Sequence, residues 1–495
     1  MTTRAGRQRR QQRRRASSPD EAVVAALRAA LEPDRVRDDD AERALLAHDA
    51  SVFAGGAAGP VCFPTSTEEV QAIVRIAVAH TRAVVPRGAG TGLSGGAIPL
   101  GRPVIVVTTK MNRILEVDLD DRVAWVEPGV VNLDLTKRLH ALGFHFAPDP
   151  SSQQACTIGG NVANNSGGPH CLAEGVTSQH VLALDVVLPD GEVVRLGDLD
   201  AEPLGYDLRG AFVGGEGTLG IATRIAVRIS KDPPAVRTLL LGFDTMEAAA
   251  TTVGKIVAAG IVPAAMEVMD HAITVAVENF VHAGYPLDAR AVLLIEVCGL
   301  EAGTELDCER VVEIGRANGA TSLKSAASDE ERALLWKGRK TAFGAVAQLA
   351  PAYYLHDTVV PRAALPSVLG AVYEIAGRHD LLVVNVFHAG DGNLHPLLLF
   401  DTREPGVLER VHAAAREIVE ISLAAGGVLS GEHGVGVEKR DYMPLQFAEV
   451  DLDHQNRLRR AFDPACRANP GKVLPAGHSC ADIQALERIP AGVWV

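Results

Sequence analysis

Three glycine-rich stretches in the first half of this 495-residue chain constrain its fold more than any other feature. The first stretch, Pro86–Gly96, contains five glycines; the second spans Pro148–Gly168 and the third Gly214–Gly220. Glycine has no Cβ, so backbone N–H groups can converge on an anion without side-chain obstruction. The three stretches together predict a site that wraps a phosphate group.

These stretches match neither of two common nucleotide sites. None ends in the Gly-Lys-Ser/Thr sequence of a Walker loop. A Rossmann site needs a helix after its glycines, whereas Pro99 and a predicted strand follow Gly96. The missing Rossmann context disfavours a nicotinamide-dependent enzyme.

The hydrophobic pattern around the glycines predicts short strands and helices without a regular βαβ series, an α+β arrangement. Helices are predicted at Asp20–Leu31, Val70–His80 and Leu133–Leu142, the second with a capping box at Thr65–Glu69. The turn Pro189-Asp190-Gly191 predicts a β-hairpin. The predicted strands are Ala83–Pro86, Val104–Thr108, Ile114–Asp118, Ala124–Glu127, Val181–Leu188, Glu192–Leu196 and Ile221–Ile229.

Lys231-Asp232-Pro233-Pro234 is typical of a domain boundary, because consecutive prolines separate elements. Strands and helices alternate after Thr238, which predicts a second, α/β domain that includes one helix over Asp329–Gln348. We therefore expect a basic tail at 1–19, a first domain at 20–232 and a second domain at 233–455. Residues 456–495 are expected to return to the first domain.

Composition excludes several classes of protein. The formal net charge of −13 disfavours nucleic-acid binding, although seven of the first fifteen residues are arginines. No apolar run approaches the roughly 18 residues that span a membrane. The seven cysteines contain no Cys-x-x-Cys pair, which argues against a thiolate zinc site or a self-contained iron–sulfur cluster. We expect a cytoplasmic protein, with a partner as its possible link to the inner face of the membrane.

A second constellation lies in the C-terminal half. Asn385–His395 holds two histidines among glycines, and Ser430–Gly436 holds Glu432 and His433. Two histidines and a carboxylate suit a divalent metal such as zinc, iron or manganese. The glycines allow the tight bends that would aim these side chains inward.

The order of motifs resembles the p-cresol methylhydroxylase-type FAD-binding domain. The matching pieces are Arg87-Gly-x-Gly-Thr91, Ile158-Gly-Gly-x-x-Ala-x-Asn165 and Gly214-x-Glu-Gly217. The resemblance implies an FAD between two α+β subdomains, held non-covalently because the first loop has no histidine. The implied cofactor-binding residues are Pro86, Arg87, Gly88, Ala89, Gly90, Thr91, Gly92, Ser94, Gly95, Pro148, Ser151, Gly159, Gly160, Asn161, Asn164, Ser166, Gly167, Glu216, Gly220, Ile221 and Asn469.

The histidine motifs resemble those of the FAD-linked D-2-hydroxy-acid dehydrogenases, nearest to their glycolate oxidase D subunits. They are His-x-Gly-Asp-Gly-Asn-x-His over 388–395 and Gly-Glu-His-Gly over 431–434. The resemblance implies that His388, His395 and Glu432 bind the metal and that His433 is the base. It also implies an α/β substrate domain that covers the flavin.

An arginine should clamp the substrate carboxylate, because its planar fork matches that anion. Our candidate is Arg339, at the position that matches the family's substrate arginine. Relatives that act on D-2-hydroxyglutarate carry a threonine and a lysine where this chain has Phe343 and Leu355. Without that lysine a second carboxylate is costly to bury, which favours glycolate or D-lactate.

No cluster motif is present to take the electrons from the flavin. The resemblance implies a second flavin subunit and an iron–sulfur subunit that lead to quinone. Two alternatives remain: an accessory flavin subunit of a glycolate oxidase complex, or a dehydrogenase of another acid such as D-2-hydroxyglutarate. The intact set of His388, His395, Glu432 and His433 argues against an accessory role.

Overall fold

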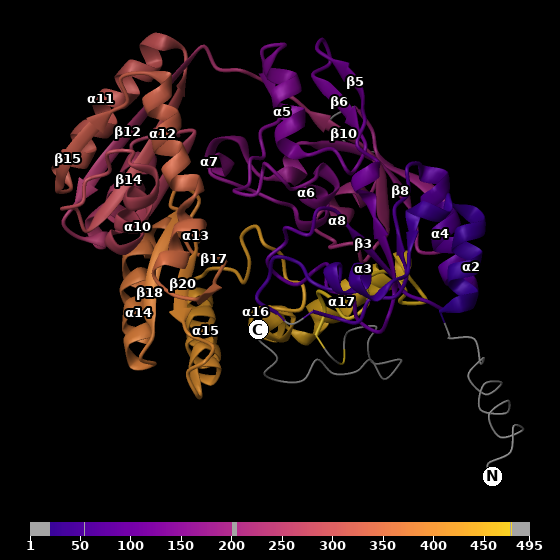
Figure 1. Ribbon diagram of the computed structural model, residues 1–495. Helices are drawn as coiled ribbons and strands as arrows, with labels where there is room; N and C mark the ends of the chain where they lie inside the picture. The colour runs from indigo at the N-terminus through magenta and orange to yellow at the C-terminus, as the bar shows by residue number, and fades with distance from the viewer. Residues whose placement is uncertain (1–19, 54, 200–204, 476, 478–495) are drawn as a thin grey trace, which may run out of the picture.

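The computed structural model describes residues 20–53, 55–199, 205–475 and 477 (Figure 1). The expected basic tail at 1–19 and the last part of the 456–495 segment lie outside these residues. The described chain forms two α+β bodies side by side. We call residues 20–231, joined by 463–474, the glycine-loop body, and residues 235–433 the cap body.

A four-stranded sheet opens the glycine-loop body, with strand order β1-β2-β4-β3 and parallel pairing among the last three strands. Helices α2 and α4 bury Leu27 and Ile73 against this sheet. Ser66 caps α4 by accepting a hydrogen bond from the Glu69 N–H, as its sequence predicts. The bounds are α2 Glu21–Ala30, β1 Val36–Arg37, α3 Asp40–Leu45, β2 Val61–Cys62, α4 Thr67–Ala79, β3 Val84–Arg87 and β4 Val104–Val107.

A five-stranded antiparallel sheet completes this body, in the order β5-β6-β10-β8-β9. Helices α5 and α6 cover one face through Leu135, Leu139 and Val162. Strands β8 and β9 form the predicted hairpin, which turns at Gly191 with φ +89°. The bounds are β5 Ile114–Asp118, β6 Val123–Val126, α5 Asn132–His140, β7 Phe144–His145, α6 Ile158–Asn164, α7 Cys171–Glu174, β8 Val181–Val187, β9 Val193–Gly197, α8 Leu208–Phe212, β10 Ile221–Arg228 and β11 Ser230–Lys231.

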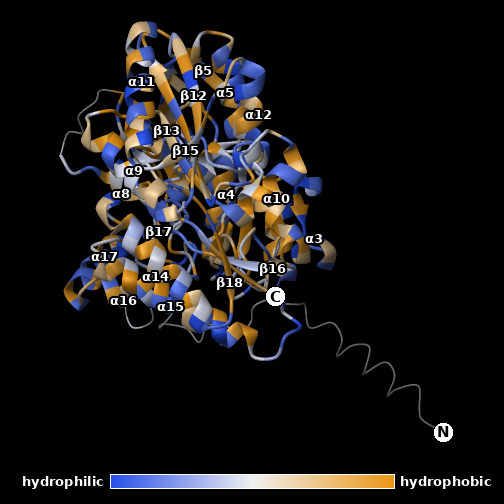
Figure 2. Ribbon diagram, turned by 90° about the vertical axis from the view of Figure 1, so that its left-hand side faces the viewer, coloured by the Kyte–Doolittle hydropathy of each residue, from blue (hydrophilic) through white to orange (hydrophobic). Residues whose placement is uncertain are grey.

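The cap body is built on an antiparallel sheet whose strands run β15-β12-β14-β13-β18, extended by β20 and β16. Alternate residues of its strands point to opposite faces. Leu239 and Leu241 therefore belong to one hydrophobic core, shared with residues of α9, α11, α14 and α15, and Leu240 belongs to another, shared with residues of α10, α12 and α13. Figure 2 shows β12, β13 and β18 as mainly hydrophobic strands, whereas the helices around them carry both hydrophobic and hydrophilic residues.

The bounds in the cap body and beyond are β12 Ala235–Phe243, α9 Met246–Ala258, β13 Ala265–Asp270, α10 His271–Val281, β14 Ala291–Gly299, α11 Glu301–Ala317, β15 Ala320–Ser325, α12 Asp329–Lys340, α13 Ala342–Ala345, β16 Ala352–Leu355, β17 Thr358–Val359, α14 Leu365–Arg378, β18 Leu382–His388, β19 Asn393–Leu394, β20 Pro396–Phe400, α15 Val407–Ala424, α16 Met443–Gln446 and α17 Glu449–Phe462. These elements confirm the mixed α and β class predicted from the sequence.

One predicted helix is wrong. The single helix expected over Asp329–Gln348 is broken at Thr341 into α12, α13 and a short 3₁₀ turn. The Thr341 hydroxyl donates hydrogen bonds to the carbonyls of Lys337 and Gly338, and such back-bonding bends helices. The bend starts a new turn directly after Lys340.

The C-terminal segment lies against the glycine-loop body, as the yellow end of the ribbon shows in Figure 1. Ala468 forms a parallel bridge with Val84 of β3, and the Val84 N–H donates to the Arg467 carbonyl at 2.8 Å. Arg459 of α17 donates to the Ala468 carbonyl at 2.7 Å. The C-terminal segment therefore reaches the strand that precedes the first glycine loop.

Candidate active site

A cavity of about 440 Å³ lies between the two bodies. One side is formed by the three glycine-rich stretches and the other by side chains of the cap body. Sixteen of the predicted cofactor residues line it: Pro86, Arg87, Gly88, Ala89, Gly90, Thr91, Gly92, Ser151, Gly159, Gly160, Asn161, Asn164, Ser166, Glu216, Gly220 and Ile221. The three stretches, far apart in sequence, thus form one continuous wall.

Close packing between the loops explains two of the glycines. A Cβ on Gly88 would lie 2.4 Å from the Thr157 hydroxyl, so the first loop touches the second. Gly217 has φ +71°, and a Cβ there would lie 2.4 Å from Pro86 Cγ, so the third loop touches the first. Any side chain at either position would push the loops apart.

Five predicted cofactor residues do not line the cavity: Ser94, Gly95, Pro148, Gly167 and Asn469. One of them, Asn469, holds two of the glycine loops together instead. The Asn469 amide donates to the carbonyls of Gly96 and Glu216, at 2.8 and 2.7 Å. The C-terminal segment therefore ties the first glycine loop to the third.

Glu216 lines the cavity and also contacts the segment that follows His433. Its carboxylate accepts hydrogen bonds from the N–H groups of Val435 and Gly436, at 2.6 and 2.8 Å. Burial raises its pKa to about 7. Its side chain therefore holds the segment that follows His433.

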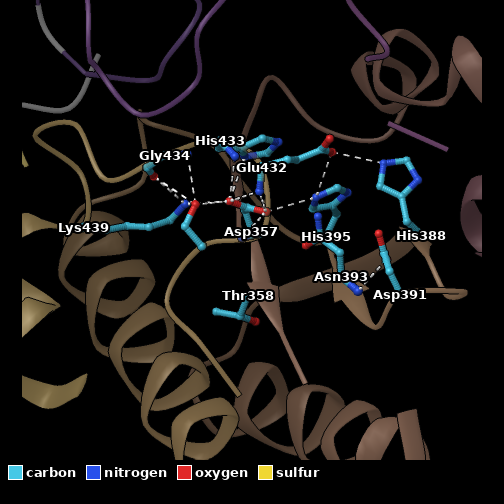
Figure 3. A network of polar contacts seen from close by, with 12 residues as sticks. Asp357, Thr358, His388, Asp391, Asn393, His395, Glu432, His433, Gly434 and Lys439 are labelled. Atoms are coloured by element: carbon cyan, nitrogen blue, oxygen red, sulfur yellow. Dashed lines mark hydrogen bonds and ion pairs between the residues drawn. The ribbon is translucent and has the colours of Figure 1, made fainter. Parts of the chain in front are cut away.

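The predicted metal ligands converge from three separate segments (Figure 3). His388 ends β18, His395 lies between β19 and β20, and Glu432 follows α15. The Glu432 Oε1 atom lies 3.1 Å from His388 Nε2 and 3.6 Å from His395 Nε2. All three are candidates for a shared ion, with each ligand atom within 4.8 Å of the others.

The sequence did not single out Glu267, a carboxylate on β13 behind His388. Its Oε1 lies 2.7 Å from His388 Nδ1, and its Oε2 accepts a 2.7 Å hydrogen bond from Arg339 Nε. A carboxylate on the second nitrogen of a ligating histidine fixes the ring orientation. Charged residues are seldom buried unless they are paired, so an acidic residue within an otherwise apolar strand indicates a buried partner. That pattern could have identified Glu267 from the sequence.

Asp357 was also not predicted, although it organises the Gly-Glu-His-Gly segment (Figure 3). Its carboxylate is fully buried and accepts hydrogen bonds from the N–H groups of Gly431, Glu432 and His433, at 3.1, 3.2 and 2.9 Å. The Lys439 ammonium lies 3.1 Å away, at Asp357 Oδ2. Although burial opposes ionisation, Lys439 holds the pKa of Asp357 well below its usual value.

The His433 side chain lines the cavity and stacks on His395, with 5.0 Å between ring centroids. Its carbonyl accepts hydrogen bonds from the Ser94 hydroxyl and the Asn164 amide, at 3.0 and 2.9 Å. Burial lowers the pKa of His433 to about 4. Residues of the glycine-loop body therefore fix the backbone that carries this imidazole.

Arg339, the candidate for the substrate carboxylate, is held by Glu267, the carboxylate that also contacts His388. Arg339 is 1% exposed, pairs with Glu267 and does not line the cavity. The next residue, Lys340, does line it, with its Nζ 3.3 Å from Asp149 Oδ2. Successive helical residues point about 100° apart, so adjacent cations face different surroundings.

The remaining wall from the cap body is largely apolar. It consists of Phe343, Tyr353 and Leu355. The ring of Phe343 lies 6.4 Å from that of His395, centroid to centroid. A small polar ligand beside the histidines would therefore meet few polar groups beyond the cluster and Lys340.

Family models match most of the chain. Residues 59–197 match the FAD binding domain, and residues 232–473 match the C-terminal domain of FAD linked oxidases. Among curated proteins, the glycolate oxidase subunit GlcD of Escherichia coli (strain K12) is 45% identical over 86% of this chain and 85% of its own. A probable mitochondrial D-lactate dehydrogenase of Danio rerio is 30% identical over 92% of both chains.

Among solved structures, p-cresol methylhydroxylase with substrate bound aligns at a TM-score of 0.79 and 15% identity. The alignment covers 93% of this chain and 98% of that one. This likeness confirms the fold expected from the glycine motifs. In the described part of the chain, every helix is too short or too polar to cross a membrane.

Proposed function

This chain belongs to the FAD-linked oxidase family, and we propose that it oxidises a short D-2-hydroxy acid, glycolate or D-lactate, to the 2-oxo acid. One observation carries the proposal. The glycine loops line a single cavity together with His395, Glu432 and His433, and His388 Nε2 lies 3.1 Å from Glu432 Oε1. A substrate in that cavity can contact a flavin and the histidines at the same time.

The cavity fits FAD, because its glycine wall presents backbone rather than side chains. No neighbouring heavy atom would lie within 4 Å of a Cβ at Gly92, which leaves open space beside the first loop. We propose that Arg87–Thr91 and Ser151–Asn161 hold the pyrophosphate. FAD held there would supply the acceptor for the hydride that leaves the substrate Cα. No histidine stands in the first loop, in keeping with a non-covalent flavin.

The cluster also fits a divalent metal ion, zinc, manganese or iron. Neither ring nitrogen of His395 makes a hydrogen bond with any residue that the structure describes, although the side chain is buried. Such nitrogens are costly to bury without a partner. We propose that His388, His395 and Glu432 hold the ion. When bound, it polarises the substrate hydroxyl and lowers the hydroxyl pKa.

His433 is the proposed base. Its imidazole lines the cavity, and its depressed pKa keeps it neutral and able to accept the hydroxyl proton near neutral pH. The stack on His395 and the hydrogen bonds on its carbonyl fix the ring beside the ligand cluster. Asp357 holds the same segment from the other side.

The apolar wall of Phe343, Tyr353 and Leu355 favours a monocarboxylate over D-2-hydroxyglutarate. We propose that the reduced flavin passes its electrons to a partner. The E. coli relative is named as a subunit, and a second flavin subunit and an iron–sulfur subunit leading to quinone are the proposed partners. A link to the inner face of the membrane would run through such a partner.

The test is anaerobic mixing of the purified yellow holoenzyme with each acid. Glycolate or D-lactate should bleach the flavin absorbance much faster than D-2-hydroxyglutarate. His433→Ala should keep the flavin and slow bleaching by about 10²- to 10⁴-fold, the range for a general base. Faster bleaching by D-2-hydroxyglutarate, or a normal rate in the variant, contradicts the substrate or the base assignment respectively.

A further inference from the structure

One turn of the glycine-loop body reaches the cap body beside the metal ligands. It comprises Gly167–His170 and α7, and α7 packs against β13 at the boundary between the two bodies (Figure 1). The turn continues the second glycine stretch directly after Asn164 and Ser166, which line the cavity. It can therefore fix the flavin wall of the cavity to the cap wall.

His170 is bonded to both bodies through its two ring nitrogens. Its Nδ1 atom lies 2.9 Å from Asp149 Oδ1 in the glycine-loop body, and its Nε2 atom lies 3.3 Å from Glu296 Oε1 on β14 of the cap body. Its ring also lies against that of Trp336, with 5.7 Å between centroids. A second ion pair, between Lys340 and Asp149 at 3.3 Å, crosses the same boundary. The imidazole thus bridges the two bodies.

The charge of His170 strengthens this bridge. Although burial opposes protonation, the carboxylates of Asp149 and Glu296 raise the pKa of His170 to about 10. Both carboxylates are buried. Hydrogen bonds between charged groups are roughly twice as strong as neutral ones. Near neutral pH the imidazolium is therefore held from both sides.

Glu296 connects the bridge to several elements of the cap body. Its Oε2 atom accepts hydrogen bonds from Trp336 Nε1 at 2.6 Å and from Thr238 Oγ1 at 3.0 Å. Arg332 lies 3.5 Å from the same atom and is shared with Asp329. The bridge therefore joins His170 to β12, β14 and α12 together.

The residues on either side of His170 contact both segments that carry the metal ligands. A Cβ on Gly167 would lie 2.9 Å from Glu432 Oε2. A Cβ on Gly390, in the turn after β18, would lie 2.8 Å from Leu172 Cδ2. The two bodies are in close contact at these points, so a shift of the turn also shifts the cavity wall relative to the ligands.

We propose that His170 is a positioning residue, whose contact with Glu296 sets the distance between the flavin wall and the metal ligands. The proposal rests on the proposed function, because that distance decides how closely the substrate Cα approaches the flavin. A misplacement of about 1 Å can cost about 10²-fold in rate. Weakening the contact should therefore slow the reaction while both binding sites stay intact.

The test compares the wild-type holoenzyme with Glu296→Gln, His170→Gln and the two substitutions combined. Anaerobic mixing with glycolate or D-lactate gives the limiting rate of flavin bleaching, per bound flavin, and the half-saturating concentration. We expect each single variant to lower the limiting rate by about 10- to 100-fold, with little change in the half-saturating concentration. The combined variant should be no slower than the slower single variant, because both residues act through one contact.

Two further variants make the result specific. His170→Arg keeps a cation with donors for both carboxylates and should recover most of the limiting rate. His145→Gln removes an imidazole–carboxylate contact, with Asp232, that does not reach the cap body, and it should bleach at the wild-type rate.

An unchanged limiting rate in both single variants overturns the proposal, and so do effects of the two substitutions that simply add. Loss of the flavin from all three variants also overturns it. The contact would then hold the cofactor site and would not set the distance.

Hydrogen exchange measured without substrate separates this proposal from the proposed function. In the variants, the amides of residues 166–174 and 388–394 should exchange faster than in the wild type. Those of α9 and α14, on the opposite face of the cap sheet from Glu296, should not change. If the contact segments exchange faster but no 2-hydroxy acid bleaches the wild-type flavin, the contact stands and the substrate assignment fails. If glycolate bleaches the wild type while exchange and limiting rate are unchanged in the variants, the substrate assignment stands and the role of His170 is wrong.

Discussion

The two walls of the cavity use different means to present polar groups. The glycine-loop wall presents backbone, and its residues come from three long stretches in which composition alone marks the site. The cap wall presents side chains, each from the end of a different strand or loop. A backbone site tolerates little added volume, whereas a side-chain site tolerates little loss of a donor atom. Substitutions in the glycine-loop wall should therefore change flavin content, whereas substitutions in the cap wall should change activity and metal binding.

The largest effect should come from adding volume to the glycine wall. Gly88→Val places a branched side chain where a Cβ already lies 2.4 Å from the Thr157 hydroxyl. The first and second loops must separate, so we expect the purified variant to lose its flavin and all flavin-dependent activity. Absorbance at the flavin bands measures this loss. The matched control is Gly370→Val on α14, where the glycine is exposed and a Cβ meets open space away from the cavity. Flavin retained by Gly88→Val would show that the two loops need not touch.

Removing a metal-ligand atom from the cap wall should lower the activity by about 10³-fold or more while the flavin is retained. Glu432→Gln removes one of the three proposed ligand atoms, and a bound ion supplies several kcal/mol of transition-state stabilisation. Bound metal, flavin content and turnover are measured on the same sample. The exposed Glu409→Gln serves as a control on α15. If the purified Glu432→Gln variant lacks flavin, flavin binding also depends on the cap wall, and the comparison of the two walls fails.

A smaller effect should come from the group behind the cluster. Glu267→Gln weakens the contact with His388 Nδ1, and loss of such a partner weakens metal affinity by about 10- to 100-fold. The substitution also leaves Arg339 unpaired, which lowers the free energy of unfolding. Arg339→Met breaks the same ion pair but leaves Glu267 on His388. Metal titration should show weaker binding in Glu267→Gln than in Arg339→Met. Equal metal affinities in the two variants would mean that Glu267 pairs with Arg339 but does not support the metal site.

The glycine-loop wall could be predicted from sequence to a large extent. Glycine density is a local property, and Gly88, Gly160 and Gly220 all line the cavity as expected. Asn469 entered the prediction only through family resemblance, and it ties the loops from behind instead of facing the cavity. Its position depends on a long-range return of the chain that no local pattern encodes.

The cap wall could be predicted only in part. His388, His395 and Glu432 stand in recognisable motifs, but Asp357 and Glu267 are single acidic residues whose partners lie more than 70 positions away. The adjacent pair Arg339 and Lys340 shows a second limit. Sequence cannot decide which of two neighbouring cations faces a cavity, because the helix rotation is set by packing of Leu335 and Trp336 in the core.

The return of Ala468 to Val84 has a consequence for how the protein matures. The wall of the cofactor cavity is complete only when residues near 84, 160, 216 and 469 are all present and packed. These segments are far apart in sequence, so no local stretch of the chain can form the wall by itself. The cavity therefore takes shape late in folding, when long-range contacts such as the one between Val84 and Ala468 form.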